Sequence, residues 1–333
     1  YFVSGVSLII PVGLVFILIL NLFKENFAFL IFGSSHYSYL IPPISLVICG
    51  LLLHALCYSY FRGRLLMIKA NILQMINMGI IPLFAFTMSN TTQQVLGITG
   101  IGILIISTTF FSFIIKDIKR ERLDILSRGK ELLGYGLQRV PGDFGMAALL
   151  SLPAIFTAHI AGVKDAGYVA FGISLLNMIG TAFAPIGLIM LPKASQLIGS
   201  KDLYRLKYYI LKLLKIAFLL TTVGVTFFEL FADKIITLYL GRAFSDIVLV
   251  ARVIMIGVLP YAIYVSMRSI IDAYYVKAVN TMNIVIALLI FLMLSGITTA
   301  MLKSYSIIIS FLIAIFILGG LTIFGVRKII REE

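Results

Sequence analysis

The chain has 333 residues, of which 61% are hydrophobic and only 12% are charged. A soluble domain is close to half apolar and a quarter charged, so this composition excludes a soluble globular protein and indicates membrane-spanning helices. Lysine and arginine outnumber the acids by 27 to 14, and in so apolar a chain this excess is typical of cytoplasmic loops and argues against a nucleic-acid partner.

Ten segments are long and apolar enough to cross a bilayer, which takes about 20 residues each. In chain order they cover residues 2–22, 38–60, 66–88, 95–115, 137–161, 166–192, 208–231, 247–271, 279–301 and 305–326. All the connections are short except 116–136 and 193–207. The sequence therefore predicts an all-α polytopic membrane protein.

The connections alternate between those rich in lysine and arginine and those that hold few. The rich set includes both long connections, 116–136 and 193–207. The poor set holds only five basic residues, Lys24, Lys164, Lys234, Arg242 and Lys303. Because positively charged loops stay in the cytoplasm, we expect the rich set and both ends of the chain to be cytoplasmic.

The second span carries a histidine near its middle, His54. Imidazole titrates near neutral pH, so His54 is a candidate for ion coupling by proton uptake. More often such a histidine only forms a hydrogen bond with a neighbouring helix. Cysteine and histidine spacings match no metal site, and neither a nucleophile elbow nor a phosphate loop occurs, so the sequence predicts no metal, no cofactor and no enzyme.

The fifth span opens with the run Tyr-Gly-Leu-Gln-Arg-Val-Pro-Gly-Asp-Phe, which places Arg139 and Asp143 four residues apart on one helix face. A charge at mid-bilayer costs at least about 2.5–3.5 kcal/mol, so charged residues in spans usually face a cavity or a partner. The arginine fork suits phosphate, and we interpret Arg139 and Asp143 as substrate-binding residues near the cytoplasmic side. The alternative is a mutual Arg139–Asp143 pair that caps the helix.

The eighth span brings three further charged residues. Arg252 lies about one turn inside its external end, and Arg268 and Asp272 lie four residues apart near its cytoplasmic end. Burial makes Arg252 and Arg268 candidates for substrate binding and Asp272 a candidate for ion coupling. The alternative for both arginines is that they extend to the nearer membrane surface.

An internal repeat appears when the chain is shifted by 208 residues, which aligns 22–33 with 230–241 without a gap. Both segments begin with Leu-Phe, place an acid two residues later and end with glycine. The first four spans then match the seventh to tenth, which predicts two six-helix lobes in parallel repeat with the first two helices absent from this chain. We expect a first lobe at 1–115, a cytoplasmic linker at 116–136 and a second lobe at 137–333.

The run from Gly134 to Phe144 resembles the opening of the second lobe in bacterial polysaccharide flippases of the O-antigen type. These belong to the multidrug/oligosaccharidyl-lipid/polysaccharide exporter superfamily. Ala166-Gly-Tyr, Ala184-Pro and Leu191-Pro-Lys-Ala-Ser are similar to the next helix of that family. The resemblance covers the whole chain by layout, and its specific residues lie within 134–202.

The resemblance implies a flippase that moves an undecaprenyl-pyrophosphate-linked oligosaccharide across the bacterial cytoplasmic (inner) membrane by alternating access, in O-antigen and lipopolysaccharide biosynthesis. Its implied partners are this lipid-linked oligosaccharide, membrane lipids, H⁺ or Na⁺ as coupling ion, and other polysaccharide-assembly proteins. Arg139 matches the family motif directly, whereas Arg252 and Arg268 are inferred from burial alone.

Two other functions stay open. A drug/cation antiporter on the same fold should line its cavity with acids, but the in-span acids Asp143 and Asp272 each have an arginine one turn away, which favours an anionic substrate. A membrane polysaccharide polymerase or acyltransferase should carry a large external loop, and the external connections of this chain are short.

Overall fold

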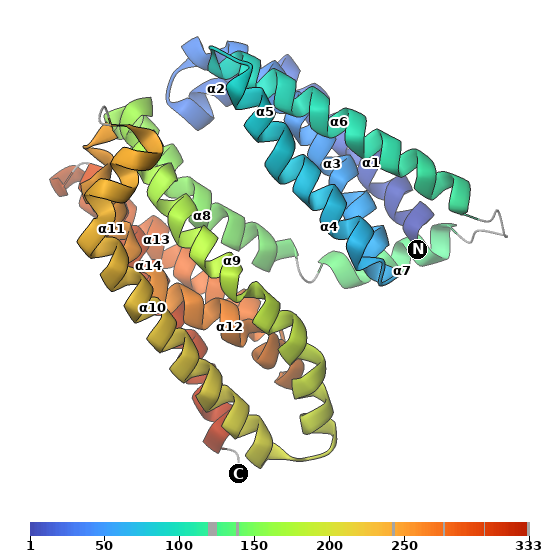
Figure 1. Ribbon diagram of the computed structural model, residues 1–333, viewed down its shortest axis with the longest axis vertical. Helices are drawn as coiled ribbons and strands as arrows, with labels where there is room; N and C mark the ends of the chain where they lie inside the picture. The colour runs from blue at the N-terminus through green and yellow to red at the C-terminus, as the bar shows by residue number, and fades with distance from the viewer. Residues whose placement is uncertain (119–124, 138–139, 242–243, 276, 303, 332–333) are drawn as a thin grey trace. The chain divides into compact units, whose positions relative to one another are not determined.

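The computed structural model describes residues 1–118, 125–137, 140–241, 244–275, 277–302 and 304–331. All the regular secondary structure in these ranges is helical, which confirms the predicted all-α class. The chain divides into two compact units, Tyr1–Gly136 and Leu137–Glu333, whose helices are drawn in Figure 1.

The helices of the first unit are, in chain order, α1 (Phe2–Leu22), α2 (Lys24–Phe32), the 3₁₀ segment η1 (Ser35–Leu40), α3 (Ile41–Gly63), α4 (Met67–Met75), the π-helical turn η2 (Ile76–Ile80), α5 (Ile81–Thr87), α6 (Thr92–Asp117) and α7 (Ile125–Leu137). α3 packs along α6, with α1 and α4 beside it (Figure 1). A Cβ atom on Gly100 of α6 would lie 2.7 Å from the backbone nitrogen of Val47 in α3. The close α3–α6 crossing therefore requires a residue without a side chain at Gly100.

The helices of the second unit are α8 (Val140–Ala161), α9 (Val163–Gly199), α10 (Leu203–Leu240), α11 (Ile247–Met255), α12 (Val258–Tyr274), α13 (Val279–Leu302) and α14 (Ser304–Arg331). α12 lies at the centre and contacts α9, α10 and α14. Its buried side chains form an apolar core with Leu176 of α9 and Phe311 of α14. Gly180 of α9 lies directly against the ring of Tyr261, so α9 and α12 approach closely.

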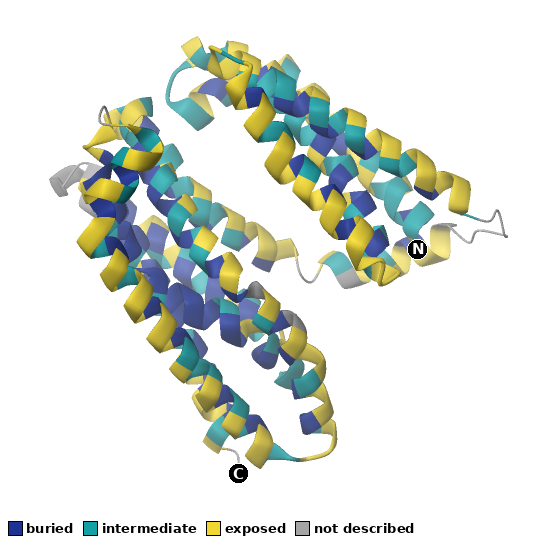
Figure 2. Ribbon diagram, in the orientation of Figure 1, coloured by how far each residue is buried: buried dark blue, intermediate teal, exposed yellow. Residues whose placement is uncertain are grey.

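Apolar side chains also cover the outer faces of both units. Val12, Phe86 and Leu238 are 71%, 72% and 91% exposed. Figure 2 shows buried residues where helices of one unit meet and exposed residues on the outward sides of the helices. Such apolar surfaces are costly in water but are accepted by lipid tails, so these faces fit a bilayer.

Nine helices of the described chain are long and apolar enough to cross a membrane, and the bent pair α11–α12 makes a tenth span if it is counted as one. Each span predicted from the sequence corresponds to one of these ten, which confirms the predicted polytopic fold. The structure adds the short segments α2, η1 and α7. α7 occupies the range predicted as a linker from Ile125 onward.

Two spans are interrupted four residues before a proline. In the third span, Met78 lies within the π-helical turn η2 and Pro82 follows at the start of α5. In the eighth span, α11 ends at Met255 and the 48° bend precedes Pro260 of α12. A proline ring clashes with the carbonyl group four residues earlier, which accounts for the position of both interruptions.

The two segments aligned by the sequence repeat both end at a glycine with a positive φ. Gly33 follows α2 with a φ of +73°, and Gly241 follows α10 with a φ of +91°. Both values lie in the left-handed region that favours glycine, which explains the shared residue. The segments differ near their start, because α1 and α2 are separated at Phe23 whereas α10 continues through its counterpart, Phe231.

Candidate functional site

An arginine held between two carboxylates forms the clearest charged site of the second unit. Arg268 of α12 places Nη2 3.1 Å from Oδ1 of Asp143, which lies in the first turn of α8. Its Nε lies 3.9 Å from Oδ2 of Asp272, one turn further along α12. The side chains of Arg268 and Asp272 are 45% exposed and that of Asp143 is 68% exposed, so other side chains of the second unit do not enclose them.

A buried asparagine holds this site together. Asn280, in the first turn of α13, is only 4% exposed, and its Nδ2 donates to Oδ1 of Asp272 at 2.7 Å and to the carbonyl oxygen of Arg268 at 2.8 Å. We call Asp143, Arg268, Asp272 and Asn280 the Arg268 cluster. It joins α8, α12 and α13, so a change at Arg268 acts on three helices.

Close packing between α8 and α13 fixes the position of Asp143. A Cβ atom on Gly142 would lie 2.7 Å from Oγ1 of Thr281 in α13. A larger residue here would press on the Thr281 side chain, so glycine favours the close approach of α8 to α13. The Gly-Asp pair that stood out in the sequence therefore has a packing role at Gly142 and a charged role at Asp143.

Two tyrosines continue the polar face of α12 away from the Arg268 cluster. The hydroxyl of Tyr261 donates to Oδ1 of Asn177 in α9 at 2.9 Å. The hydroxyl of Tyr264, whose side chain is almost fully buried, has no hydrogen-bond partner among the described residues. Residues 261, 264, 268 and 272 recur at helical spacing, so they form one polar stripe along α12.

The charges of the Arg268 cluster do not balance when both carboxyls are ionised. One guanidinium faces two carboxylates, so the cluster carries a net charge of −1. An anionic ligand at Arg268 must therefore replace at least one carboxylate. The sequence spacing indicated the Asp272 contact, but the shorter contact comes from Asp143, which is 125 residues away in the chain.

Arg252 lies in a second cluster of the same kind. Its Nη2 is 2.6 Å from Oδ2 of Asp233, and its Nε is 3.7 Å from Oε2 of Glu229; both acids belong to α10. Arg252 and Arg268 are 16 residues apart, roughly 24 Å along a helix. The structure therefore does not bring the two candidate arginines into one site. Asp233 was missed in the sequence, although its spacing of four residues from Glu229 was visible.

His54 lies in an uncharged polar network of the first unit. His54 is 7% exposed, and its Nε2 is 3.0 Å from Oε1 of Gln74 in α4. Its Nδ1 is 2.9 Å from Nδ2 of Asn77 in η2, and that same amide nitrogen donates to Oγ of Ser107 in α6 at 2.9 Å. We call these four residues the His54 network. Only His54 was singled out in the sequence, because lone Gln, Asn and Ser residues in a span carry no pattern.

Arg139, the residue that matches the family motif, lies outside the described residues. Asp143 is described, and its ion pair there is with Arg268. Within the described ranges, no three His, Cys, Asp or Glu side chains gather as a metal site would require. The candidate residues thus fall into the Arg268 cluster, the Arg252 cluster and the His54 network.

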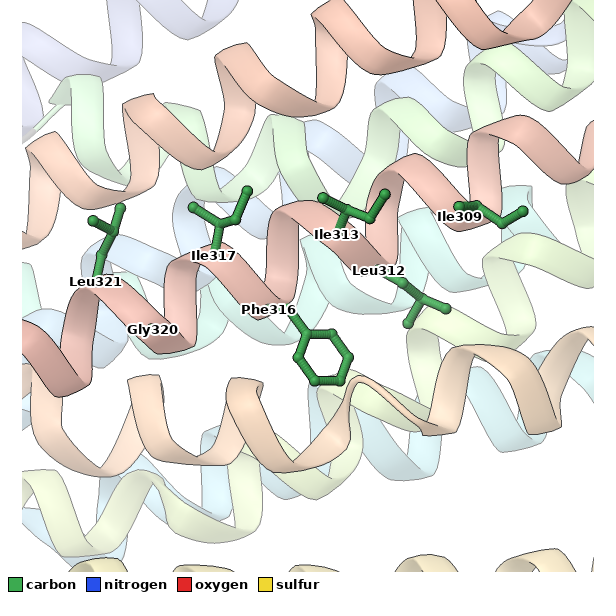
Figure 3. A pocket seen from close by; sticks show the side chains of 7 residues that line it. All are labelled: Ile309, Leu312, Ile313, Phe316, Ile317, Gly320 and Leu321. Atoms are coloured by element: carbon green, nitrogen blue, oxygen red, sulfur yellow. The ribbon is translucent and has the colours of Figure 1, made fainter.

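A shallow groove of about 610 Å³ follows one side of α14. Figure 3 shows the residues that line it, which are all apolar or glycine: Ile309, Leu312, Ile313, Phe316, Ile317, Gly320 and Leu321. None of these side chains can donate or accept a hydrogen bond. The groove can therefore accommodate hydrocarbon but cannot select a head group.

A scan against protein-family models and a search of curated proteins found no match. Among solved structures, the chain is similar to lipid II flippase MurJ in an inward closed conformation, with 16% sequence identity, a TM-score of 0.76, and coverage of 98% of this chain and 72% of that chain. It is also similar to a multidrug resistance MATE family transporter of the MOP superfamily in its inward-facing conformation, with 13% identity, a TM-score of 0.77, and coverage of 96% and 79%.

An outward-facing conformation of a MATE family transporter matches with 12% identity, a TM-score of 0.59, and coverage of 96% of this chain and 76% of that chain. At such low identities the likeness shows the fold alone. Since it covers nearly the whole chain, this protein has the helical fold of these membrane transporters. That is the class of fold predicted from the sequence.

Proposed function

We propose that the protein is a transporter of the MOP superfamily that moves a lipid-linked oligosaccharide across the membrane by alternating access. The observation that carries the proposal is the Arg268 cluster, in which one arginine links carboxylates of two helices at a site that other side chains of the second unit do not enclose. Pyrophosphate oxygens can replace a carboxylate at the guanidinium fork, because both accept two parallel hydrogen bonds.

This exchange would connect substrate binding to helix movement. Asp143 and Arg268 form a charged contact between α8 and α12. A head group that takes the place of Asp143 breaks the ion pair between α8 and α12. The substrate-bound protein then favours another arrangement of these two helices. A ligand shifts a conformational equilibrium only through such a difference in interaction.

The detailed substrate follows from the sequence resemblance. The motif around Arg139 supports an undecaprenyl-pyrophosphate-linked oligosaccharide of the O-antigen type, and a similar structure described as a lipid II flippase supports a lipid-linked cargo. On this proposal the protein lies in the bacterial inner membrane with both chain ends in the cytoplasm. H⁺ or Na⁺ drives the cycle, and other polysaccharide-assembly proteins supply and consume the cargo.

A second candidate is a drug/cation antiporter. It is favoured by the excess of acid at both arginines, since Arg252 and Arg268 each face two carboxylates. The pairing of Asp143 and Asp272 with arginine therefore supports an anionic substrate less strongly than the sequence spacing indicated. The two candidates differ in the sign of the charge that the Arg268 cluster recognises.

Complementation tests the flippase proposal. In cells whose own copy of the gene is deleted, the Arg268→Gln and Arg139→Ala variants should lower surface polysaccharide about tenfold or more, because each loses charged hydrogen bonds to the head group. Lys164→Gln is the matched control, since it removes an exposed cation paired with Asp246. Unchanged polysaccharide in Arg268→Gln at normal protein level would refute the role of the Arg268 cluster.

A further inference from the structure

The inference concerns the His54 network, where a widened helical turn brings an amide into the interior of the first unit. The backbone N–H of Ile81 donates to the carbonyl of Ile76, five residues earlier, which defines the π-helical turn η2. Pro82 explains why the turn widens at this place. Asn77 lies in the turn and is fully buried, with its amide between α3 and α6. Turns of this kind are frequent at functional sites.

With the Gln74 amide oriented as in the structure, its contact with His54 assigns the proton of the neutral ring to one nitrogen. Oε1 of Gln74 can only accept, so the Nε2 atom beside it donates and bears hydrogen. Nδ1 then has a free lone pair and accepts from Nδ2 of Asn77. The neutral ring is thus held in the Nε2–H form, and Nδ1 is the atom that can take up a second proton.

The amide of Asn77 can reverse when His54 gains a proton, because the two hydrogen bonds that Nδ2 gives up are replaced by two that Oδ1 accepts. Its Oδ1 atom is buried and has no hydrogen-bond partner among the described residues, so a half-turn of the amide breaks no bond on that side. After the half-turn, Oδ1 faces both Nδ1 of His54 and Oγ of Ser107. A protonated Nδ1 donates to this oxygen, and the serine hydroxyl, which both donates and accepts, donates to it as well.

Among the described residues of the first unit, no charged side chain has a contact with the His54 ring itself. The guanidinium of Arg62, two turns further along α3, lies 5.6 Å from the centre of the Tyr58 ring. On α3 itself, Tyr58 stacks on the His54 ring, and Cys57 donates to the carbonyl oxygen of Ser107. The charged residues on the helices packed against α3 are exposed. Those on α4 and α6 lie more than one turn along the helix from Gln74 and Ser107, and the others belong to the short segments α2 and η1. They are Lys69 on α4, Lys116 and Asp117 on α6, and Lys24 and Glu25 on α2; η1 carries His36, and α1 has no titratable side chain.

We infer that His54 and Asn77 form a proton-binding site, in which the proton adds to Nδ1 and the Asn77 amide reverses to accept it. The proton adds to a lone pair, and only hydrogen bonds are exchanged. Because Asn77 belongs to the turn between α4 and α5, uptake of the charge acts directly on the break in the third span. Its role as the step that couples H⁺ to transport rests on the proposed function, whereas the site itself does not.

Nitrogen-15 NMR of histidine-labelled protein in lipid nanodiscs tests the site. The chain has three histidines, so a His36→Gln/His159→Gln background leaves His54 as the single signal. At high pH the ring should show the Nε2–H form, and on acidification Nδ1 should gain a proton. An Nδ1–H form at high pH would overturn the inference.

Two opposite substitutions of Asn77 separate a proton-binding role from a purely structural one. Asn77→Leu keeps the size but removes both the donor to the neutral ring and the acceptor for the protonated ring. The hydrogen bond to the charged ring is the stronger of the two, so the proton affinity of His54 should fall about tenfold. Asn77→Asp places a carboxylate beside the ring, so the proton affinity should rise at least about tenfold. If the midpoint of the His54 titration is unchanged in either folded variant, Asn77 is not part of a proton-binding site.

The coupling role is tested separately in liposomes. A pH gradient should accelerate transbilayer movement of a pyrophosphate-linked lipid oligosaccharide by the unsubstituted protein, and His54→Gln should remove the acceleration while movement without a gradient persists. A gradient response that survives in His54→Gln overturns the coupling. Failure of the proposed function is distinguishable, because neither protein would then move the lipid under any condition.

Discussion

Arg268 is the residue on which the proposed substrate site depends, and its surroundings argue for exchange between partners. A guanidinium between two half-exposed or exposed carboxylates gains little stability from either pair, typically about 0–1 kcal/mol. Such contacts break at low cost, so an incoming head group can compete with Asp143. A fully buried pair would resist exchange, because a lone buried charge is expensive.

Asp143→Asn distinguishes an anionic from a cationic substrate. Removal of the competing carboxylate should increase the affinity of Arg268 for a soluble pyrophosphate-linked sugar about tenfold, measured by calorimetry on the purified protein. The same variant should leave thermal stability nearly unchanged, since the pair is exposed. If the site instead serves a cationic substrate, Asp143→Asn should lower the affinity for a cationic drug, measured in the same way.

Local spacing predicted the candidate residues but not their partners. The i, i+4 pattern correctly placed Arg268 beside Asp272, yet the shorter contact is with Asp143 on another helix. Such a contact depends on how α8, α12 and α13 pack, which no local pattern encodes. Asn280 was missed for the same reason, because its importance comes only from the two groups that its amide reaches.

The helices themselves were predictable because the bilayer fixes their length and composition. All ten spans match, whereas α2, η1 and α7 were missed because they are short or lie in polar connections. The two interruptions were not predictable from proline alone. Pro82 and Pro260 follow breaks, but Pro11, Pro153 and Pro185 lie inside unbroken helices. Whether a helix breaks depends on packing around the freed carbonyl.

Pro82→Ala tests whether the proline maintains the π-helical turn. Alanine restores an N–H that can donate to the carbonyl of Met78, so η2 should revert to α-helix and turn Asn77 away from His54. The NMR titration of His54 should then resemble that of Asn77→Leu, with proton affinity lowered about tenfold. Pro11→Ala, in the unbroken α1, is the matched control and should leave the titration unchanged. An unaltered His54 signal in Pro82→Ala would mean that the turn has another cause.

The candidate polar sites of the two units differ in charge and in burial. The first unit has the uncharged His54 network, and the second unit has two arginines, each facing two carboxylates. The proposed division of roles follows from this chemistry. A neutral network can gain one charge from a proton, whereas a charged cluster can exchange one anionic partner for another.

Transbilayer movement of a fluorescent, pyrophosphate-linked lipid oligosaccharide in liposomes that contain the purified protein tests the central claim most directly. A membrane-impermeant quencher reports how much lipid has changed leaflet. We predict that the unsubstituted protein and Lys164→Gln move the lipid at similar rates. Arg268→Gln should move it at about a tenth of that rate or below. Equal rates in Arg268→Gln and the unsubstituted protein, or uptake of a cationic dye without movement of the lipid, would contradict the account.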